Sequence, residues 1–264
     1  MNIGIIGYGV MGEAIASALV RQHGCEVVVV FDVDPTRCAC AQESSVTVIG
    51  SIAAMLPKVE ILVLAVKPQQ YHVLASEMNG HIGHHLVISI MAGISLDQLE
   101  EQLDTSRVVR TMPNTPAQIG QGLTVWIASG GVTPQDKLET EQILSAFGKH
   151  LELKNEDMVN AATAISGSGP AYVFLLAQAL EESAIALGFD RETARLLVTE
   201  TLRGSSALYY DQRQVAPQEL RRRVTSPGGT TNAAMESLGV EKFVELWKAA
   251  TQAAYKRAQE LSQR

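Results

Sequence analysis

The amino-acid sequence predicts an α/β fold, in which a doubly wound and mostly parallel sheet is followed by an all-α domain. Three observations support this expectation. Short apolar runs rich in β-branched residues alternate with helix-like segments through the first 154 residues, and such alternation is typical of a parallel sheet. A glycine-rich motif connects the first of these runs to the first helix. After residue 155 the strand-like runs stop and only helix-like segments follow.

Six apolar runs in the first half are expected to be strands. Five are nearly continuous in apolar character, as strands buried on both faces should be, and the sixth is expected at the domain edge. Their ranges are Ile3–Ile6, Val27–Phe31, Ile61–Val66, Leu86–Ile90, Val108–Thr111 and Leu123–Ile127. Helices are expected between and after them, at Met11–Arg21, Pro35–Gln42, Gln69–Met78, Leu96–Leu103 and Pro134–Phe147.

The second half is expected to be a helical domain. Its helices, joined by short Gly, Pro or Asp turns, are predicted at residues 156–165, 170–187, 191–210, 217–224, 230–237 and 240–262. Residues 171–187 are apolar on more than one face, and a helix of that type requires burial on several sides. We therefore expect a helical core shared between two subunits. The predicted domains are residues 1–154 and residues 155–264.

Composition and charge exclude several classes of protein. The 264 residues are 46% hydrophobic and 19% charged, which is ordinary for a globular protein. The net charge of −7 gives no basic surface for nucleic acid, and no Lys/Arg run suggests binding to an anionic membrane. The longest apolar-rich stretch, Ala171–Leu187, contains two glutamates and is too polar to span a bilayer. Since no basic leader follows Met1 and three cysteines leave one unpaired, we expect a cytoplasmic protein.

Gly7, Gly9 and Gly12 form a Gly-x-Gly-x-x-Gly motif directly after the first expected strand. In this context the first glycine permits a tight turn, and the second lets the backbone approach a pyrophosphate. The third lets the helix pack closely on the sheet. The start of the helix then offers free N–H groups and the positive end of its dipole to the phosphates. The motif therefore predicts a Rossmann-type domain that binds NAD(P).

Asp32 stands 20 positions after Gly12, at the end of the second expected strand. Its carboxylate can accept hydrogen bonds from the adenine ribose hydroxyls and would repel a ribose 2′-phosphate. We therefore expect NADH to be used at least as well as NADPH. The nearest cation for such a phosphate is Arg37. The alternative is that Asp32 only caps the following helix, which has Pro35 near its first turn.

Three further segments end expected strands: AVKPQ at residues 65–69, SIMAG at 89–93 and RTMPNTP at 110–116. Ligands in open α/β sheets bind at the carboxyl ends of strands, so all three segments could lie along one dinucleotide. A fourth segment, VTSPGGTT at residues 224–231, leads into a helix of the second half. Its successive N–H groups and hydroxyls suit a small carboxylate. Alternatively, this loop is only a helix-capping turn.

Together these segments closely resemble pyrroline-5-carboxylate reductases, and the resemblance extends to SGSGPAY at residues 166–172. It implies hydride transfer from NADPH or NADH to the C=N bond of 1-pyrroline-5-carboxylate. The product would be L-proline, in the final step of proline biosynthesis. It also implies a site without a metal and a homodimer that is intertwined through the helical domain. The substrate loop of one subunit would face the cofactor of the other, and such dimers can assemble into decamers.

The resemblance also implies site residues. NAD(P)H would contact the glycine-rich turn and the strand tips, at Ile6, Gly7, Tyr8, Gly9, Val10, Met11, Asp32, Ala65, Val66, Lys67, Pro68, Ile90, Met91, Ala92 and Asn114. The substrate carboxylate would be held by Ser226, Gly228, Gly229, Thr230 and Thr231. Thr231 and Ser226 are the expected catalytic residues. The Thr231 hydroxyl would orient the ring nitrogen during proton delivery, and the Ser226 hydroxyl would orient the carboxylate together with the loop amides.

Two positions depart from the family's pattern. Bacterial relatives often carry Asn-Arg-type residues where this chain has Asp32 and Val33, which weakens an expectation of NADPH preference. Gln214 stands where some members have a ligand-contacting glutamate, and we assign it no role.

Two other functions share part of the pattern. A β-hydroxyacid dehydrogenase would fit the glycine-rich start, but it needs a lysine base, and no lysine of the second half lies in a Gly-rich context. A dinucleotide-sensing regulatory protein would not need a carboxylate-binding loop.

Lys67 precedes a proline, so its backbone is expected to matter more than its ammonium group. The histidines at residues 81, 84 and 85 are expected to form a solvated loop, because no carboxylate or cysteine is near them in sequence.

Overall fold

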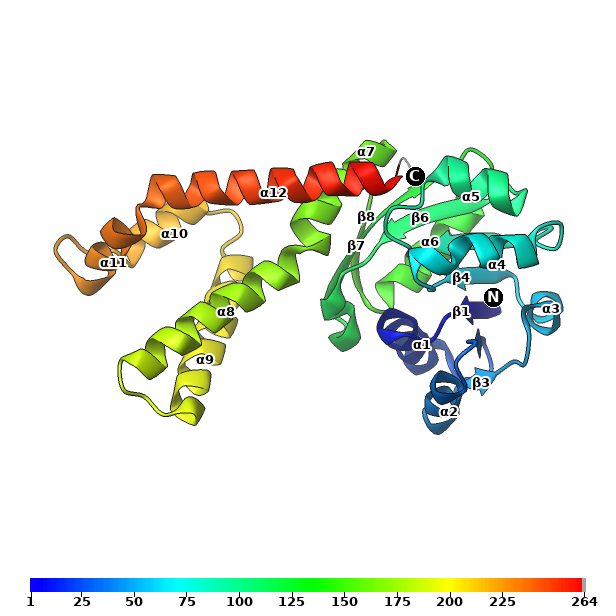
Figure 1. Cartoon of the computed structure of the whole chain (residues 1–264), viewed down its shortest axis with the longest axis horizontal. Helices are drawn as coiled ribbons and strands as arrows, with labels where there is room; N and C mark the ends of the chain where they lie inside the picture. Colours follow the sequence, from blue (N-terminus) through cyan, green and yellow to red (C-terminus); the bar gives the residue numbers. More distant parts are fainter. Residues whose placement is uncertain (263–264) are drawn as a thin grey trace. The chain divides into compact units, whose positions relative to one another are not determined.

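The computed structural model describes residues 1–262, and the chain folds into two compact units (Figure 1). Among the described residues, one unit comprises residues 1–168 and 254–262, and the other comprises residues 169–253. Within residues 1–262 the first unit contains every strand, whereas the second is helical. The fold class expected from the sequence is therefore confirmed. The predicted division of roles, in which residues 1–154 bind the cofactor and residues 155–264 bind the substrate and form the dimer, stays a prediction.

One sheet forms the centre of the first unit, and its eight strands among the described residues follow the order β3-β2-β1-β4-β5-β6-β7-β8 (Figure 1). The strands are β1 (Ile3–Ile6), β2 (Val28–Phe31), β3 (Thr47–Val48), β4 (Ile61–Leu64), β5 (Leu86–Ser89), β6 (Val108–Met112), β7 (Gly122–Ala128) and β8 (Gly148–Glu152). Neighbouring strands are parallel except β6 and β7. The strand order reverses at β1, and such a switch point leaves a crevice for a ligand at the carboxyl ends of the strands.

All six expected strands are present, but β3 and β8 were not predicted. β3 has only two residues, too few to produce a periodic pattern. β8 has the mixed sequence Gly-Lys-His-Leu-Glu and is largely exposed, because it pairs only with β7 at the sheet edge. A strand that is not buried on both faces lacks the continuous apolar run that identified the others.

Helices cover both faces of this sheet, as a doubly wound fold requires. Neighbouring residues of β4 point to opposite faces: Leu62 belongs to one hydrophobic cluster and Val63 to the other. The helices of this unit are α1 (Val10–His23), α2 (Pro35–Glu43), α3 (Ile52–Met55), α4 (Tyr71–Met78), α5 (Leu96–Leu103), α6 (Pro134–Ser145) and α7 (Glu156–Ala162). A π-helical turn, Thr163–Gly167, follows α7.

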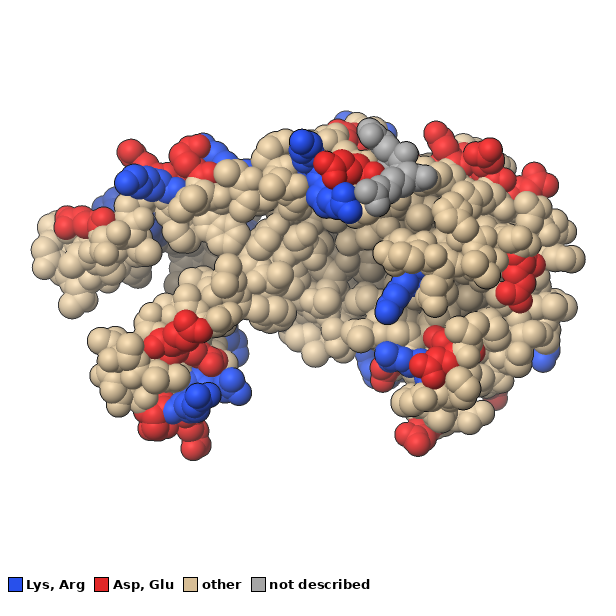
Figure 2. Space-filling view, in the orientation of Figure 1, with Lys and Arg blue, Asp and Glu red and all other residues tan. Residues whose placement is uncertain are grey.

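The second unit consists of helices whose apolar residues are largely exposed. Its helices are α8 (Gly169–Ala186), α9 (Arg191–Asp211), α10 (Pro217–Arg223), α11 (Thr230–Leu238) and most of α12 (Val240–Ser262). No residue of α8 is buried, and Phe174 and Leu175 keep 66% and 61% of their surface exposed. Much of the surface drawn over α8 carries no charge (Figure 2). Apolar surface of this extent indicates an interaction site.

Among residues 1–262, no helix has both the length and the apolar character that crossing a membrane needs. The same part of the chain contains no group of three His, Cys, Asp or Glu side chains arranged to hold a metal ion. His85 is not solvated as expected: it is buried, and its ring nitrogens contact the carbonyl oxygens of Ile82 and Leu56. Its ring N–H can therefore donate to a backbone carbonyl oxygen within the protein.

Candidate active site

The glycine-rich turn between β1 and α1 has two glycines that the fold itself requires. Gly7 has φ of +100°, and a Cβ at this position would lie 2.7 Å from the Ala65 carbonyl oxygen. A Cβ on Gly12 would lie 2.0 Å from the Gly7 carbonyl oxygen. Gly9 differs, because no atom lies within 4 Å of the place its Cβ would take. The space at Gly9 therefore remains open to a ligand at the start of α1.

Asp32 is held in place by two backbone amides. Its Oδ2 accepts a hydrogen bond from the Tyr8 amide at 2.6 Å, and its Oδ1 accepts one from the Asp34 amide at 2.9 Å. The residue that caps α2 is Asp34, which accepts a hydrogen bond from the Thr36 amide at 2.9 Å. The alternative in which Asp32 caps that helix is therefore wrong. Each Asp32 oxygen still has capacity for a further hydrogen bond.

A cavity of about 520 Å³ opens beside this carboxylate, at the carboxyl ends of β1, β2 and β4. Seven of the expected cofactor residues line it: Ile6, Gly7, Gly9, Asp32, Ala65, Val66 and Lys67. Arg37, named as the nearest cation, lines it as well. The cavity has the position that a dinucleotide takes in a fold of this type. The remaining cofactor residues proposed from the sequence do not line it.

One wall of this cavity was not expected from the sequence. Besides residues near the end of β2, it is formed by Gln70, Val73, Leu74 and Glu77 on and just before α4. These residues are spaced three and four apart, so they share one face of the helix. Val73 keeps 75% of its surface exposed, and the sequence has no pattern that distinguishes this wall from an ordinary amphipathic helix.

The loop that follows β5 is held firmly at its start. The Ser89 hydroxyl accepts a hydrogen bond from the Met91 amide at 3.3 Å, and Thr111 donates one to the Ser89 carbonyl oxygen at 2.9 Å. The Met91 side chain is buried in the hydrophobic cluster on one sheet face. A cofactor at this loop would therefore meet the Met91 backbone and not its side chain. The roles expected of Ile90, Met91 and Ala92 stay predictions.

The Asn114 side chain connects two backbone segments. It donates to the Ser166 carbonyl oxygen at 3.0 Å and accepts a hydrogen bond from the Leu123 amide at 2.9 Å. Ser166 lies in the π-helical turn, and such turns are frequent at functional sites. The amide of Asn114 thus holds the β6–β7 connection against the π-helical turn, and its contact with the cofactor stays a prediction.

The expected substrate loop lies in the second unit, before α11. Gly229 is the N-cap of this helix and provides no side-chain cap. The hydroxyls of Ser226, Thr230 and Thr231 make no hydrogen bond to the described residues, and Ser226 and Thr230 are exposed. Gly228 has φ of +71°, which favours glycine. The loop therefore caps α11 through Gly229 and leaves the three hydroxyls unused as caps, and its role in binding the substrate stays a prediction.

Comparison with known proteins identifies the family of this chain. A family model described as NADP oxidoreductase coenzyme F420-dependent matches residues 2–93, and a model described as pyrroline-5-carboxylate reductase dimerisation matches residues 156–261. The pyrroline-5-carboxylate reductase of Pseudomonas aeruginosa is 38% identical over 267 residues, which cover 99% of this chain and 97% of the relative. The chain belongs to the pyrroline-5-carboxylate reductases.

Other members of the family are similar over their whole length. The reductase of Synechocystis is 35% identical and covers 100% of this chain and 99% of the relative. The solved pyrroline-5-carboxylate reductase of Coxiella burnetii has a TM-score of 0.89 at 33% identity, with 99% and 98% of the two chains covered. The Plasmodium falciparum enzyme, solved with NADP bound, has a TM-score of 0.88 at 28% identity, with the same coverage. The resemblance drawn from short motifs is thus confirmed for the complete chain.

Proposed function

We propose that this chain reduces the ring C=N bond of 1-pyrroline-5-carboxylate to L-proline, with NADPH or NADH as the hydride donor. The observation that carries the proposal is the full-length similarity to pyrroline-5-carboxylate reductases, at 38% identity for the Pseudomonas aeruginosa enzyme. The reaction is the last step of proline biosynthesis. The same similarity favours imine reduction over oxidation of a hydroxyacid and over a sensing role without catalysis.

Steady-state reduction of 1-pyrroline-5-carboxylate with each cofactor tests this proposal. We expect NAD(P)H oxidation that depends on the cyclic imine, and none with a panel of β-hydroxyacids and NAD(P). Turnover of a hydroxyacid without turnover of the imine would contradict the proposal.

The cavity beside Asp32 fits the adenosine half of a dinucleotide. Gly9 leaves room for a pyrophosphate at the start of α1, where the helix N–H groups and dipole favour anions. Asp32, Arg37 and Lys67 provide polar groups along the cavity wall. The bound cofactor would supply the hydride, so the protein has to position the reacting carbon within about 3–3.5 Å of the donor.

The loop of residues 226–231 would hold the substrate. The amides of Thr230 and Thr231 at the start of α11 can bind a carboxylate, and the exposed Ser226 hydroxyl can add a hydrogen bond. The Thr231 hydroxyl would then orient the ring nitrogen while that nitrogen is protonated. Residues 1–154 would serve the cofactor and residues 155–264 the substrate and the dimer.

Replacing Thr231 by alanine is expected to lower kcat at least about tenfold, which corresponds to about 1.4 kcal/mol in the barrier. The reason is loss of the hydroxyl that orients the ring nitrogen. Thr231→Ser keeps the hydroxyl and should retain most of the turnover. Steady-state kinetics of both variants measure the effect, and equal kcat for wild type and Thr231→Ala would remove Thr231 from the mechanism.

Asp32 is expected to make NADH at least as good a cofactor as NADPH. Its carboxylate is fixed by two backbone amides at the cavity, and a 2′-phosphate placed there would meet a like charge. Neutralising this charge with Asp32→Asn should raise kcat/KM for NADPH relative to NADH by about tenfold. Arg37→Ala should lower kcat/KM for NADPH and leave NADH little changed. A wild-type enzyme that strongly prefers NADPH would contradict this assignment.

The exposed apolar surface of the second unit supports a homodimer. Phe174 and Leu175 belong to a helix without any buried residue, and burying a large apolar side chain contributes about 1.5–3 kcal/mol. In the proposed dimer, the substrate loop of one subunit faces the cofactor of the other. Further assembly to a decamer and a location in the cytoplasm are part of the same proposal.

A further inference from the structure

We propose that Arg110 is a positioning residue for the reaction, which fixes the loop of residues 90–95 through Glu156 and the last turn of α12. The inference rests on the proposed function, because that function assigns Ile90, Met91 and Ala92 to the nicotinamide end of the cofactor. All groups involved belong to the unit that contains the sheet. None of them lines the cavity beside Asp32.

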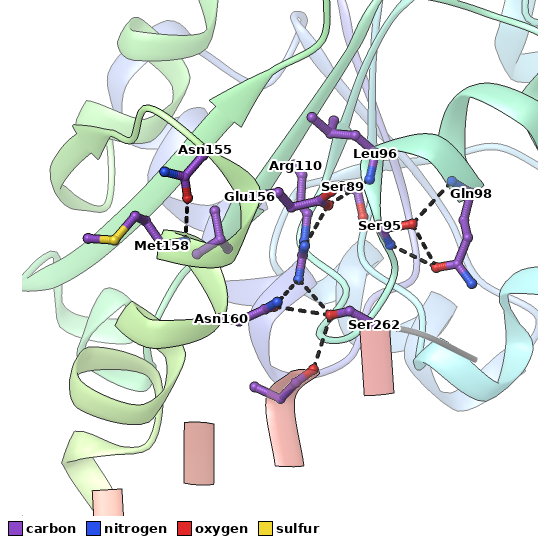
Figure 3. Close-up of polar contacts among 12 residues, drawn as sticks. Ser89, Ser95, Leu96, Gln98, Arg110, Asn155, Glu156, Met158, Asn160 and Ser262 are labelled. Carbon is purple, nitrogen blue, oxygen red and sulfur yellow. Dashed lines mark hydrogen bonds and ion pairs between the residues drawn. The ribbon is translucent and has the colours of Figure 1, made fainter. Parts of the chain in front are cut away.

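Arg110 lies on β6 and is almost completely buried, with 2% of its surface exposed. Its Nη1 donates to Glu156 Oε1 at 2.5 Å, and its Nη2 donates to Asn160 Oδ1 at 2.9 Å and to Ser262 Oγ at 3.3 Å (Figure 3). Glu156 and Asn160 are on α7, and Ser262 is on the last turn of α12. A buried guanidinium requires such partners, so this group connects β6, α7 and α12.

The same Glu156 oxygen also holds the far end of the loop. Oε1 accepts a hydrogen bond from the Leu96 amide at 2.7 Å, and Leu96 is the first residue of α5. Ser95, the N-cap of α5, accepts a hydrogen bond from the Gln98 amide at 3.2 Å. The Leu96 amide therefore needs a different acceptor. A carboxylate at this position also complements the positive end of the helix dipole. One atom therefore joins Arg110 to the end of the loop (Figure 3).

The last turn of α12 contacts the middle of the loop. Gly93 has φ of +76°, and a Cβ on it would lie 2.7 Å from Leu261 Cβ. Leu261 precedes Ser262, whose hydroxyl donates to Asn160 Oδ1 at 3.0 Å and accepts from Arg110. The loop is thus held at its start by Ser89, in its middle by Leu261 and at its end by Glu156.

In this arrangement the nicotinamide end and the adenosine end of the cofactor depend on different groups of residues. Hydride transfer is sensitive to displacements of about 1 Å at the reacting centre, and a loosened loop would displace the nicotinamide end. The adenosine end lies against a cavity lined by Asp32 and Arg37, which share no hydrogen bond with the Arg110 group. Loss of the Glu156 contacts should therefore affect turnover and NADH binding, and leave binding of ADP-ribose unchanged.

The test compares three variants of the full chain. Glu156→Ala removes both hydrogen bonds of Oε1, whereas Glu156→Gln keeps an acceptor for Leu96 and loses the charge. Glu152→Gln is the matched control, since Glu152 pairs with Lys137 at 2.5 Å elsewhere on the unit. For each variant, ADP-ribose and NADH affinities are measured by calorimetry, and kcat is measured with 1-pyrroline-5-carboxylate.

For Glu156→Ala we expect kcat to fall at least about tenfold and NADH affinity to weaken, with the Kd for ADP-ribose within about twofold of wild type. Glu156→Gln should recover part of the loss, and Glu152→Gln should match wild type. Equal weakening of ADP-ribose and NADH, or unchanged kcat and NADH affinity in Glu156→Ala, would overturn the proposal. If the wild-type chain does not reduce the imine, the proposed function fails, while the two affinities still test the role of the Arg110 group.

Discussion

Gly9→Ala is expected to weaken NADH binding by at least about thirtyfold, or about 2 kcal/mol, without changing the stability of the free protein. The reason is that no protein atom lies within 4 Å of a Cβ at this position, and the backbone there is extended, with φ of −74° and ψ of −173°. The added methyl would occupy the space that the pyrophosphate needs against the start of α1. Calorimetric titration with NADH and thermal unfolding of the free protein measure the two quantities.

Two other glycines provide controls for this experiment. A Cβ on Gly12 would lie 2.0 Å from the Gly7 carbonyl oxygen, so Gly12→Ala should lower the melting temperature of the free protein. Gly130 has no atom within 4 Å of its Cβ position and does not line the cavity, so Gly130→Ala should change neither quantity. Normal NADH affinity in Gly9→Ala would show that the dinucleotide does not lie on this turn.

Phe174→Glu is expected to convert the protein to monomers and to abolish turnover. Phe174 keeps 66% of its surface exposed in the isolated chain, so a carboxylate there has no cost in the monomer. In a subunit interface the same carboxylate would be buried without a partner, which costs several kcal/mol (roughly 3–5). Turnover should be lost with the dimer, because the proposed substrate loop and cofactor come from different subunits. Sedimentation and steady-state kinetics measure both effects.

Leu138→Glu is the matched control for the dimer experiment. Leu138 keeps 55% of its surface exposed, and it lies on α6 of the unit that contains the sheet. The same charge change there should leave both assembly and turnover unchanged. Full activity in a Phe174→Glu protein that sediments as a monomer would contradict a site shared between subunits, and an intact dimer would contradict the use of α8 as its interface.

Local patterns were sufficient to predict most elements of this fold. The six apolar runs correspond to strands because most of them are buried on both faces, which leaves a continuous signal in the sequence. Helix positions were likewise expected to within a few residues, because Asp34, Thr133 and Asn155 cap them from the preceding turn. β3 and β8 were missed, since a two-residue strand and a mostly exposed edge strand have no such signal.

The candidate site was predicted only in part. Gly7 and Gly12 could be identified because their roles are set by backbone contacts within one strand–turn–helix unit. Whether Asp32 caps α2 could not be decided from the sequence, and the structure shows that Asp34 is the N-cap. The α4 wall of the cavity was missed, since its mixture of polar and apolar side chains is typical of any amphipathic helix packed on a sheet.

The sequence by itself determined the fold class, the glycine-rich turn and the family, because each depends on short segments whose residue types are strongly constrained. Only the tertiary structure decided which side chains that are distant in sequence contact one another. Arg110, Glu156 and Ser262 lie far apart in sequence and give no periodic or motif signal, yet they share one buried network. The physical reason is that a buried charge requires hydrogen-bond acceptors, and here the packing of β6, α7 and α12 places those acceptors next to it.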